Sequence, residues 1–514
     1  MDLGTAFDAA VARDPAALAI VDGETRKTFS EWQDDIRRVA GGLSMRGLGR
    51  GDHVVVIMPN RYKMTVLYWA CQMLAAIFTP FNWRATKDEI SYVLTDAEAK
   101  LVAFDAASRE AVVAAADQAG VDATTLLSVA DGDYDELLTS APVRWPVGAA
   151  ETEICLMLYT SGTTGRPKGV PRSHRAERIA AASVIAHLRY HFGESQLGVM
   201  PLFHTMGIRI LLCSTLLNGT FVNMRGFDAG QALDLIEREN IESVFLVPTM
   251  FHDMLSHADF EPDRCQSVRN VAYAGMSMTA SLERRCANAF NPEIFANYYG
   301  SSEIFTFTIC DHLGSKPGCA GRAGINQVMR VVRADADGRA MPDEILVVGE
   351  IGEVIATMAS PEAFTGYWKR PDADDKAIRG GWYFTGDLGY VDQDGELFLC
   401  GRIDDMIISG GENIHPEEIE DVLAECDLVA QAAVVGLPDE RWGQKVVAFI
   451  EPAGARATPE ALDAHCRAST LARFKRPRSY VFIDRFPKSA AGKLLRRFLR
   501  DGDYDILPGF DSTL

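Results

Sequence analysis

A loop rich in glycine, serine and threonine, at residues 159–170, carries the residue types that bind phosphate. It reads Tyr-Thr-Ser-Gly-Thr-Thr-Gly-Arg-Pro-Lys-Gly-Val and follows the apolar run 154–158. Its glycines allow backbone N–H groups to turn toward an anion, its hydroxyls add donors, and Lys168 adds a positive charge. The Gly-Lys-Ser/Thr ending of the P-loop is absent, because Pro167 precedes this lysine and Gly169 follows it. The loop therefore predicts a polyphosphate cradle, with a flexible surface loop as the alternative.

Two acidic residues lie in short segments that could complete such a site. Glu303 ends the segment Tyr-Gly-Ser-Ser-Glu at 299–303, and Asp387 lies within Trp-Tyr-Phe-Thr-Gly-Asp-Leu-Gly at 382–389. A carboxylate offers two acceptor oxygens, which suit hydroxyl donors or a hard cation such as Mg²⁺. Taken singly, Glu303 would be a solvated surface carboxylate and Asp387 a turn residue. Their segments are what make both of them candidate binding residues.

The composition is that of a globular protein with more than one domain. The chain has 514 residues, of which 47% are hydrophobic and 24% charged, and this length exceeds what one core normally supports. The net charge of -20 argues against nucleic acid or an anionic membrane surface as a partner. Ten scattered cysteines without a C-x-x-C pair favour reduced thiols and a cytoplasmic location. We expect neither a signal peptide nor a membrane span.

The elements that would position these residues alternate between short apolar strands and amphipathic helices. Helical spacing runs from Phe29 to Arg46, with Ser30 as the expected N-cap, and an apolar strand follows at 54–58. We expect a helix at 61–75, a helix opened by Thr86, and strands at 101–104, 197–200, 221–224, 244–247 and 271–273. This alternation predicts an α/β fold with parallel, doubly wound sheets.

The pattern changes in the last third of the chain. Short strands separated by Gly/Asp turns over 321–401 predict a small β-rich lobe on the large domain. A boundary is expected at 402–405. After it we expect strands at 406–408, 432–436, 446–450 and 480–483, and helices from Pro416 and over 459–467. We therefore predict a large N-terminal domain over residues 1–403 and a small α+β C-terminal domain over residues 404–514.

In the order of its motifs the whole chain resembles the adenylate-forming superfamily of acyl- and aryl-CoA ligases, luciferases and peptide-synthetase adenylation domains. The loop at 159–170 and the segments at 299–303 and 382–389 are followed by Pro-Lys-Ser-Ala-Ala-Gly-Lys at 487–493. The likeness is greatest to aryl-CoA ligases of the 4-chlorobenzoate type, through Asp-Asp-Met-Ile-Ile-Ser-Gly-Gly-Glu-Asn-Ile-His-Pro at 404–416. It implies that ATP and Mg²⁺ convert a carboxylic acid to an acyl-adenylate, and that CoA then accepts the acyl group.

The resemblance implies a role for each residue of the ATP site. Tyr299 would lie against adenine, the Ser302 hydroxyl would contact phosphate, and Glu303 would hold Mg²⁺. Asp387 would accept hydrogen bonds from the ribose hydroxyls, and Arg402 would contact ribose or phosphate. The serine at 302 stands where the family usually has threonine, and it keeps the hydroxyl. The residues expected to cradle the β- and γ-phosphates are Thr160, Ser161, Gly162, Thr163, Thr164, Gly165 and Lys168.

The resemblance also makes the C-terminal domain mobile. Lys493 would stabilise charge at the α-phosphate in the transition state. The domain would then rotate about Asp404, remove that lysine and build a tunnel for the pantetheine of CoA. The residues expected at CoA are Arg84, Gly410, Gly411, Trp442, Phe474, Arg476 and Arg478, whose aromatic faces and guanidinium forks suit adenine and phosphates. Arg496, Arg497 and Arg500 are expected on a solvated helix face.

The acyl pocket is expected to be compact and mostly apolar. Amino-acid-activating relatives place an aspartate where His204 stands, so we do not expect an amino acid substrate. His204 would lie beside the acid's carboxylate, with a satisfied core histidine as the alternative. Tyr298 and Phe305 are bulky enough to oppose a long alkyl chain, and Ser183 is placed at the pocket floor. The pocket positions are His204, Thr205, Met206, Asn297, Tyr298, Gly300 and Phe305, with Arg209 added as a hypothesis.

Arg209 interrupts the apolar helix at 207–212, close to the expected pocket. One hypothesis is that it recognises a second polar group on the acid. The alternative, an ion pair with a neighbouring carboxylate, is the favoured one.

The sequence thus predicts an AMP-forming acid–CoA ligase that acts on a small aromatic or alicyclic carboxylic acid, with Lys493, His204 and Glu303 as catalytic residues. A medium-chain fatty acid–CoA ligase, an adenylation enzyme that loads a carrier protein, and a non-catalytic nucleotide-binding relative are the alternatives. The expected partners are the acid, ATP and CoA, without nucleic acid or membrane, for a monomer or homodimer.

Overall fold

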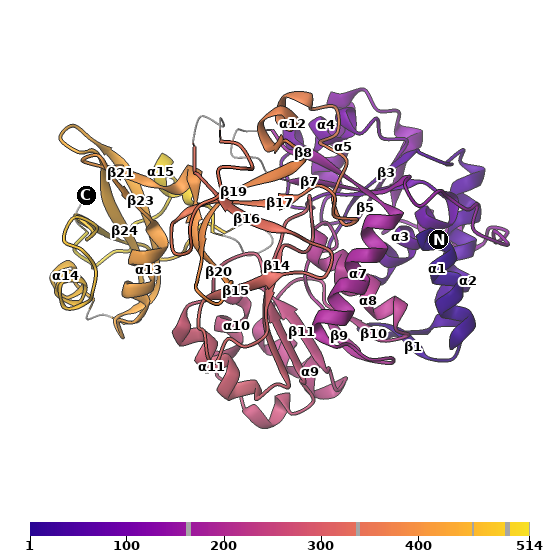
Figure 1. The fold of residues 1–514 in the computed structure, drawn as a ribbon. Coiled ribbons are helices and arrows are strands. Elements are labelled where there is room, and N and C mark those ends of the chain that lie inside the picture. The colour runs from indigo at the N-terminus through magenta and orange to yellow at the C-terminus, as the bar shows by residue number, and fades with distance from the viewer. Residues whose placement is uncertain (161–165, 336–339, 455–456, 489–493, 513–514) are drawn as a thin grey trace.

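The computed structural model describes residues 1–160, 166–335, 340–454, 457–488 and 494–512. They form a large sheet-rich N-terminal domain and a smaller C-terminal domain, which Figure 1 shows in orange and yellow at the left. The prediction of a doubly wound α/β domain followed by a small α+β domain is confirmed.

The first sheet of the large domain has six strands. They are β3 (His53–Ile57), β4 (Ile77–Pro80), β5 (Leu101–Phe104), β6 (Leu126–Ser128), β7 (Ile154–Thr160) and β8 (Lys168–Ser173). Their order is β6-β5-β3-β4-β7-β8, and only the β7–β8 pair is antiparallel. The helices that precede β7 in the sequence are α1 (Leu3–Arg13), α2 (Phe29–Met45), α3 (Tyr62–Leu74), α4 (Lys87–Asp96), α5 (Arg109–Ala119) and α6 (Asp133–Leu138), with a 3₁₀ turn at Ala123–Thr125.

The second sheet runs from the N-terminal part of the chain into the β-rich lobe. Its parallel part comprises β1 (Leu18–Asp22), β9 (Ser195–Gly198), β10 (Thr220–Asn223), β11 (Ser243–Leu246), β12 (Asn270–Tyr273) and β13 (Ile294–Tyr299), with β2 (Thr25–Thr28) antiparallel at the edge. The helices are α7 (His174–Leu188), α8 (Thr205–Leu216), α9 (Ala229–Arg238), α10 (Pro248–Leu255) and α11 (Ala280–Phe290), with a 3₁₀ turn at Pro262–Cys265.

The lobe continues this sheet instead of forming a separate one. Its elements are β14 (Thr308–Cys310), β15 (Cys319–Ala323), β16 (Met329–Val332), β17 (Gly352–Thr357), α12 (Pro371–Ala377), β18 (Ile378–Arg379), β19 (Trp382–Val391) and β20 (Leu397–Arg402). Antiparallel pairing of β13 with β14, β14 with β15 and β15 with β20 joins lobe and domain. The sequence predicted the lobe but not this continuity.

Several strands lie one or two residues earlier than predicted. The predicted strand at 54–58 is β3, and the one at 197–200 is β9. Met58 and Met200 follow these strands and are fully buried without belonging to them. An apolar run therefore marks burial, and it overruns the last hydrogen-bonded residue of the strand.

The start of α2 corrects the predicted cap. Thr28, not Ser30, is the N-cap, and its hydroxyl accepts a hydrogen bond from the Glu31 N–H while the Glu31 carboxylate accepts one from the Thr28 N–H. This reciprocal capping box satisfies two backbone donors that the helix leaves unpaired, so it prevails over the serine two residues later. Thr86 caps α4 as predicted, with Glu89 as its partner.

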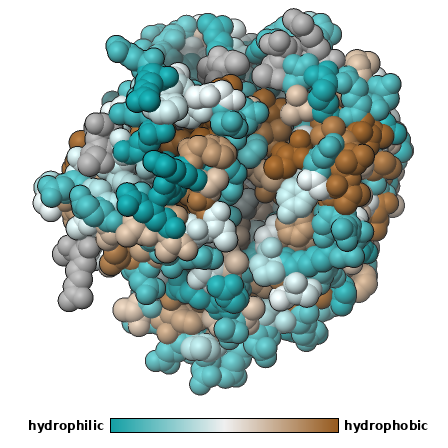
Figure 2. All heavy atoms as spheres, turned by 60° about the vertical axis from the view of Figure 1, so that its left-hand side comes forward, coloured by the Kyte–Doolittle hydropathy of each residue, from teal (hydrophilic) through white to brown (hydrophobic). Residues whose placement is uncertain are grey.

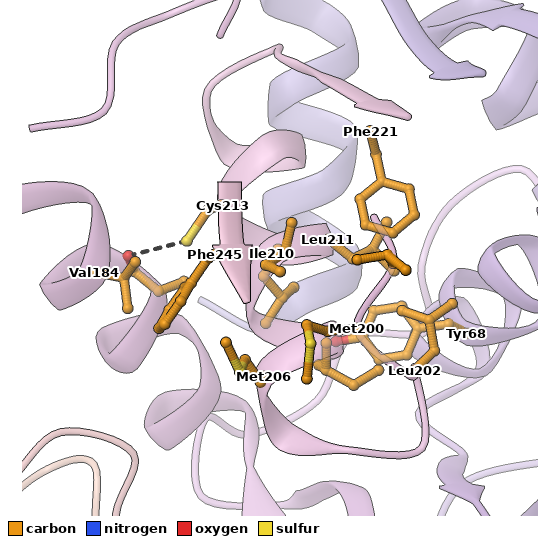
Figure 3. Close-up of a cluster of buried hydrophobic side chains, with 14 of the residues drawn as sticks. Tyr68, Val184, Met200, Leu202, Met206, Ile210, Leu211, Cys213, Phe221 and Phe245 are labelled. Atoms are coloured by element: carbon orange, nitrogen blue, oxygen red, sulfur yellow. Dashed lines mark hydrogen bonds between the residues drawn. The ribbon is translucent and has the colours of Figure 1, made fainter. Parts of the chain in front are cut away.

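The core of the large domain surrounds α8, of which every residue except the last is buried. Figure 3 shows its Met206, Ile210 and Cys213 side chains among hydrophobic residues that include Phe245 of β11 and Met200. The helix is enclosed by α1, α7 and the strands β9 and β10, so it is buried on all sides although it carries Arg209. Its first turn is thereby held at the carboxyl ends of parallel strands.

The C-terminal domain has its own sheet and core. Its strands are β21 (Ile407–Ser409), β22 (Glu412–Ile414), β23 (Val429–Asp439), β24 (Gly443–Pro452) and β25 (Ser479–Phe482), and its helices are α13 (Pro416–Ala424), α14 (Pro459–Ala468) and α15 (Arg496–Asp501). A single 3₁₀ turn, Ile403–Asp405, connects it to β20. α13 packs against β20 of the large domain.

The prediction of a solvated face for three arginines of the basic tail is wrong for Arg496. Its side chain is 16% exposed and forms ion pairs with Glu420 at 2.7 Å, Glu417 at 3.4 Å and Asp405 at 3.7 Å. The carboxylates come from α13 and from the connection between the domains, so sequence proximity could not indicate them. Arg497 and Arg500 are exposed as predicted.

One face of the molecule is mainly polar. Figure 2 shows hydrophilic residues over most of one face, with hydrophobic residues gathered in patches between them. Within the described parts of the chain, no helix has both the length and the apolar character needed to cross a bilayer.

Candidate active site

The carboxylate of Asp387 is held at both oxygens by two other predicted site residues. The Tyr299 hydroxyl at the end of β13 donates to Asp387 Oδ2 at 2.6 Å, and the Arg402 guanidinium donates to Oδ1 at 2.8 Å. Arg402 faces Asp387 across the β19–β20 pair. A carboxylate has about four lone-pair positions, so two of them remain for further donors such as a pair of hydroxyls.

Electrostatics keep Tyr299 and Arg402 in fixed charge states at neutral pH. Burial lowers the pKa of Arg402, but the nearby Asp387 carboxylate more than offsets this and holds the pKa above its usual value. Burial, and then the charge of Asp387, raises the pKa of Tyr299. Tyr299 therefore donates as a neutral phenol, and Arg402 remains a cation.

Gly386 fixes the turn that presents Asp387. Its φ of 73° lies in the left-handed region, and a Cβ atom there would come within 2.8 Å of the Arg402 guanidinium. The Gly386 N–H donates to Glu353 Oε1 at 3.0 Å, and the Asp387 N–H donates to Thr385 Oγ1 at 3.0 Å. The strand β19 thus positions the carboxylate through its backbone.

Glu303 and Lys168 both contact Tyr367, one at its hydroxyl and the other over its ring. The Tyr367 hydroxyl donates to Glu303 Oε1 at 2.7 Å, and Lys168 Nζ lies 4.3 Å from the centre of the Tyr367 ring. Burial lowers the pKa of Lys168, while the charge of Glu303 opposes that shift. Tyr367 therefore joins a predicted cation to a predicted carboxylate, and nothing in the spacing of the sequence indicated it.

The environment of Glu303 fits a hard divalent cation. The side chain is buried, and within the described ranges none of the lysines or arginines lies within ion-pair distance of it. A buried carboxylate needs a compensating charge, and among the described residues the hydrogen bond from Tyr367 occupies only Oε1. Together with substrate phosphates, this carboxylate could hold Mg²⁺.

The two ends of the phosphate loop lie opposite each other. Thr160 ends β7, Lys168 begins β8, and the two residues pair across this hairpin. Ser302 is buried next to Glu303. Ser161, Gly162, Thr163, Thr164 and Gly165 of the loop, and Lys493, lie outside the described residues.

The predicted acyl pocket residues fall in two groups. His204 is the N-cap residue of α8, and Thr205 and Met206 form its first turn. Tyr298 packs between Phe305, with ring centres 5.5 Å apart, and Phe245, at 5.7 Å.

Backbone and side-chain hydrogen bonds fix the second group. The Asn297 amide donates to the Cys319 carbonyl at 2.9 Å, and the Tyr298 hydroxyl bonds to Thr306 Oγ1 at 2.7 Å. A Cβ atom on Gly300 would meet the Phe305 carbonyl oxygen at 1.7 Å, so only glycine allows this turn. Tyr298 and Phe305, which together we call the aromatic wall, are therefore anchored through the Tyr298 hydroxyl and through the backbone at Gly300.

Comparison with known proteins shows which family this arrangement represents. The profile of the AMP-binding enzyme family matches residues 7–368, and that of the AMP-binding enzyme C-terminal domain matches residues 418–493. The chain belongs to the AMP-binding enzyme family. This confirms the predicted superfamily and the predicted class of enzyme.

The similarity extends over nearly the whole chain. A 4-chlorobenzoate–CoA ligase of Arthrobacter sp is 34% identical over 501 residues, which cover 95% of this chain and 93% of the relative. A long-chain-fatty-acid–CoA ligase of Mycobacterium tuberculosis is 31% identical over 492 residues, with 95% of each chain covered. The ATP-bound crystal structure of MatB from Rhodopseudomonas palustris has a TM-score of 0.88 at 26% identity, with 98% of this chain and 99% of that one covered.

Within this AMP-binding enzyme, three of the residues expected at CoA lie together in the C-terminal domain. The Arg478 guanidinium lies 4.3 Å from the Trp442 ring centre, and a Cβ atom on Gly410 would come within 2.9 Å of the Trp442 ring. Phe474 is exposed, with 42% of its surface accessible. Arg476 is half-buried and Gly411 is exposed. Arg84 lies in the large domain, before α4, where its guanidinium stacks on Trp83.

The structure favours the ion-pair explanation of Arg209 over substrate recognition. Arg209 NH2 donates to both carboxylate oxygens of Glu177 at 3.0 Å, and both side chains are fully buried. The guanidinium lies 4.6 Å from the centre of the Phe305 ring. Arg209 thus packs against Phe305, and its charge is already paired.

Ser183 and Arg172 belong to the same buried polar network. Ser183 Oγ donates to Glu362, instead of lining an open floor. Arg172 donates to Glu177 at 2.8 Å and to the carbonyl oxygens of Glu303 at 2.8 Å and Glu362 at 2.7 Å. Sequence reasoning missed Arg172, because its segment Lys-Gly-Val-Pro-Arg-Ser is polar and gave no signal of a buried charge.

Proposed function

We propose that this enzyme is an ATP-dependent acid–CoA ligase that activates a small aromatic or alicyclic carboxylic acid. The observation that carries the choice of acid is the aromatic wall of Tyr298 and Phe305, against which the buried ion pair of Arg209 with Glu177 packs. A long alkyl chain would have to pass these rings and then lie against buried charges, which apolar groups do not solvate. A flat ring needs no such extension.

The reaction would proceed in two balanced steps. A carboxylate oxygen of the acid attacks the α-phosphorus of ATP, and pyrophosphate leaves. The sulfur of CoA then attacks the acyl carbon, its proton is released, and AMP leaves with the oxygen that came from the acid.

The residues divide this work by location. Asp387, Tyr299 and Arg402 would bind the ribose and adenine, and Lys168 with the loop residues 160–165 would hold the β- and γ-phosphates. Glu303 would hold Mg²⁺, which would supply positive charge to the phosphates when bound. His204 would lie beside the carboxylate, at the start of α8.

We further propose that residues 1–403 and 404–514 act as two domains that move relative to each other about Asp404. Asp404 is exposed within the single turn that connects β20 to β21. Lys493 would serve the first step and leave the site before the second. In the second step, CoA would be contacted by Gly410, Gly411, Trp442, Phe474, Arg84, Arg476 and Arg478.

A second candidate is a fatty acid–CoA ligase, because a relative with that name is 31% identical. The test of both is pyrophosphate release with ATP and Mg²⁺, with and without CoA, over benzoates, cyclohexanecarboxylate, furoate, hexanoate, octanoate and amino acids. We expect CoA-dependent turnover that is highest on ring acids. A maximum on hexanoate or octanoate would favour the fatty acid ligase, and turnover that ignores CoA would favour loading of a carrier protein.

A further inference from the structure

A group of potential metal ligands lies where the large sheet turns into the β-rich lobe. Cys310 ends β14, His312 follows it, and Cys319 begins β15. One ligand atom from each of these three residues lies within 4.8 Å of the other two. Both cysteines are fully buried, whereas the imidazole of His312 is 40% exposed and gives the group a side open to solvent.

A carboxylate and a backbone donor complete the surroundings of these ligands. Glu396, which precedes β20, places Oε1 2.9 Å from His312 Nε2 and Oε2 3.6 Å from Cys319 Sγ. Glu396 is buried. The Gly321 N–H donates to Cys319 Sγ at 3.1 Å, a contact that favours a sulfur carrying negative charge. Three side chains therefore converge, and Glu396 from a third segment contacts two of them.

We propose that Cys310, His312 and Cys319 bind a divalent transition metal ion of the zinc type, with Glu396 as the fourth ligand or as the hydrogen-bond acceptor of His312. Two thiolates and an imidazole are a ligand set that zinc prefers, and three protein ligands plus a carboxylate make a four-coordinate site. The ligand atoms lie within 4.8 Å of one another, and zinc–sulfur and zinc–nitrogen bonds of about 2.0 to 2.3 Å require them to approach by no more than about 1 Å.

The local charges are compatible with metal binding. Binding releases one proton from each of the two thiols, so the added charge of the ion is balanced by two thiolates. Lys316 Nζ lies 3.0 Å from Glu396 Oε2, and Arg322 lies 3.3 Å from Oε1. These two cations compensate the Glu396 carboxylate, and Asp311 faces His312 Nδ1 at 3.3 Å. No charge needs to be buried alone when the metal enters.

The other cysteines do not form such a group. In the described part of the chain, this is the one set of three histidine, cysteine or acidic residues whose ligand atoms converge in this way. Cys400 on β20 is half-buried and lies outside the set. It therefore offers a matched control for loss of a thiol in the same lobe.

The position of the site gives it a consequence for the fold. Cys310 pairs with Asn297 across β13 and β14, and the Cys319 carbonyl accepts the Asn297 amide at 2.9 Å. Glu396 immediately precedes β20, so it brings that strand into the same group. A metal ion would thus tie together β14, β15 and β20 directly behind the strand that carries the aromatic wall.

The experiment is a titration of the chelator-treated full chain with Co²⁺, followed by competition with Zn²⁺. We expect one ion per chain, intense thiolate-to-cobalt absorption in the near ultraviolet, tetrahedral bands in the visible, and a higher Tm with zinc. His312→Ala, Cys310→Ser and Cys319→Ser should each remove the absorption, while Cys400→Ser should retain it. Glu396→Gln should weaken zinc binding by about 10- to 100-fold.

The proposal is overturned if the wild-type chain gives no thiolate–cobalt absorption. It is equally overturned if the absorption survives in His312→Ala and both serine variants, which would mean adventitious binding elsewhere. Because His312 is exposed, its alanine variant is expected to fold, and circular dichroism checks this. A Cys310–Cys319 disulfide in the isolated protein, detected as two missing thiols under non-reducing conditions, would assign the pair to redox chemistry instead.

Discussion

The buried charges around Glu177 show how single residues shape this enzyme's interior. Glu177, Arg172 and Arg209 are all fully buried. Although burial alone would raise the pKa of Glu177, the charges of Arg209 and Arg172 hold it below its usual value. Such a group is stable only when complete, because removal of one partner leaves another charge buried without compensation.

The first prediction concerns Arg209. Arg209→Met should lower the free energy of unfolding by about 3 kcal/mol or more, since Glu177 then keeps only Arg172 as its partner. The order of preference among ring acids should not change, because the guanidinium is occupied by Glu177 and packs against Phe305. Urea unfolding and the acid panel provide the two measurements.

Arg238→Met is the matched control, because Arg238 is exposed on α9 and pairs with the adjacent Glu239. It should change the free energy of unfolding by no more than about 0.5 kcal/mol. If Arg209→Met left stability intact and selectively impaired acids with a second polar group, Arg209 would be a substrate ligand after all.

At the residue scale, the sequence predicted which side chains share a site more reliably than the contacts between them. Tyr299, Asp387 and Arg402 were expected at one nucleotide, and they contact one another directly. Tyr367 was not expected, because its partner Glu303 is 64 residues away and no spacing rule connects them. Arg209 was left with two explanations since its partner, Glu177, lies on a different helix.

At the scale of elements, the type of each element was easier to predict than the pairing between distant strands. The alternation of strands and helices indicated parallel sheets, and the Gly/Asp turns indicated a β-rich lobe. The pairing of β15 with β20 helps to join the parallel sheet to the β-rich lobe. It connects residues far apart in the sequence, so the local pattern carried no information about it. The cap of α2 shows the same limit, because Thr28 with Glu31 and Ser30 with Gln33 both fit the local pattern of a capping box.

The second prediction concerns Glu353 on β17, which accepts the N–H of Gly386 next to Asp387. Burial raises the pKa of Glu353 from 4.5 to about 7. Between these two values the folded chain holds a proton that the unfolded chain has lost. Stability from this group is therefore complete below about pH 4.5 and is lost as the pH rises through 7, a decline of up to about 3 kcal/mol.

Glu353→Gln should remove this decline, because a neutral amide stays neutral at every pH and still accepts the Gly386 N–H. The Tm difference between variant and wild type should shift in favour of the variant from pH 5 to pH 8. Glu350→Gln, an exposed carboxylate just before β17, is the control and should track the wild type. A Tm difference for Glu353→Gln that is constant with pH would contradict the assignment.

At the scale of the whole molecule, two separate cores meet through a narrow connection. Gly401, with a φ of 118°, lies so close to α13 that a Cβ atom would come within 2.2 Å of the Glu417 carboxylate. Arg496 then joins Glu417 and Glu420 to Asp405 of the connecting turn. These contacts define one relative position of the domains through a few polar groups, an arrangement that domain motion can break without exposing a large apolar surface.

The last prediction tests that motion through Lys493, which belongs to the segment between Lys488 and Leu494. Lys493→Ala should lower acyl-adenylate formation by about 100-fold or more, as loss of a preorganised charge donor does. Thioester formation from supplied acyl-adenylate and CoA should be largely retained if the domain rotates as proposed, because the rotated domain would present other residues to the site. Lys488→Ala removes an exposed lysine from the same segment and should leave both steps near wild type.

Single-turnover measurements of each half-reaction decide the matter. If Lys493→Ala impaired both steps equally while Lys488→Ala impaired neither, one fixed arrangement of the domains would serve the whole reaction, and the alternation about Asp404 would be wrong.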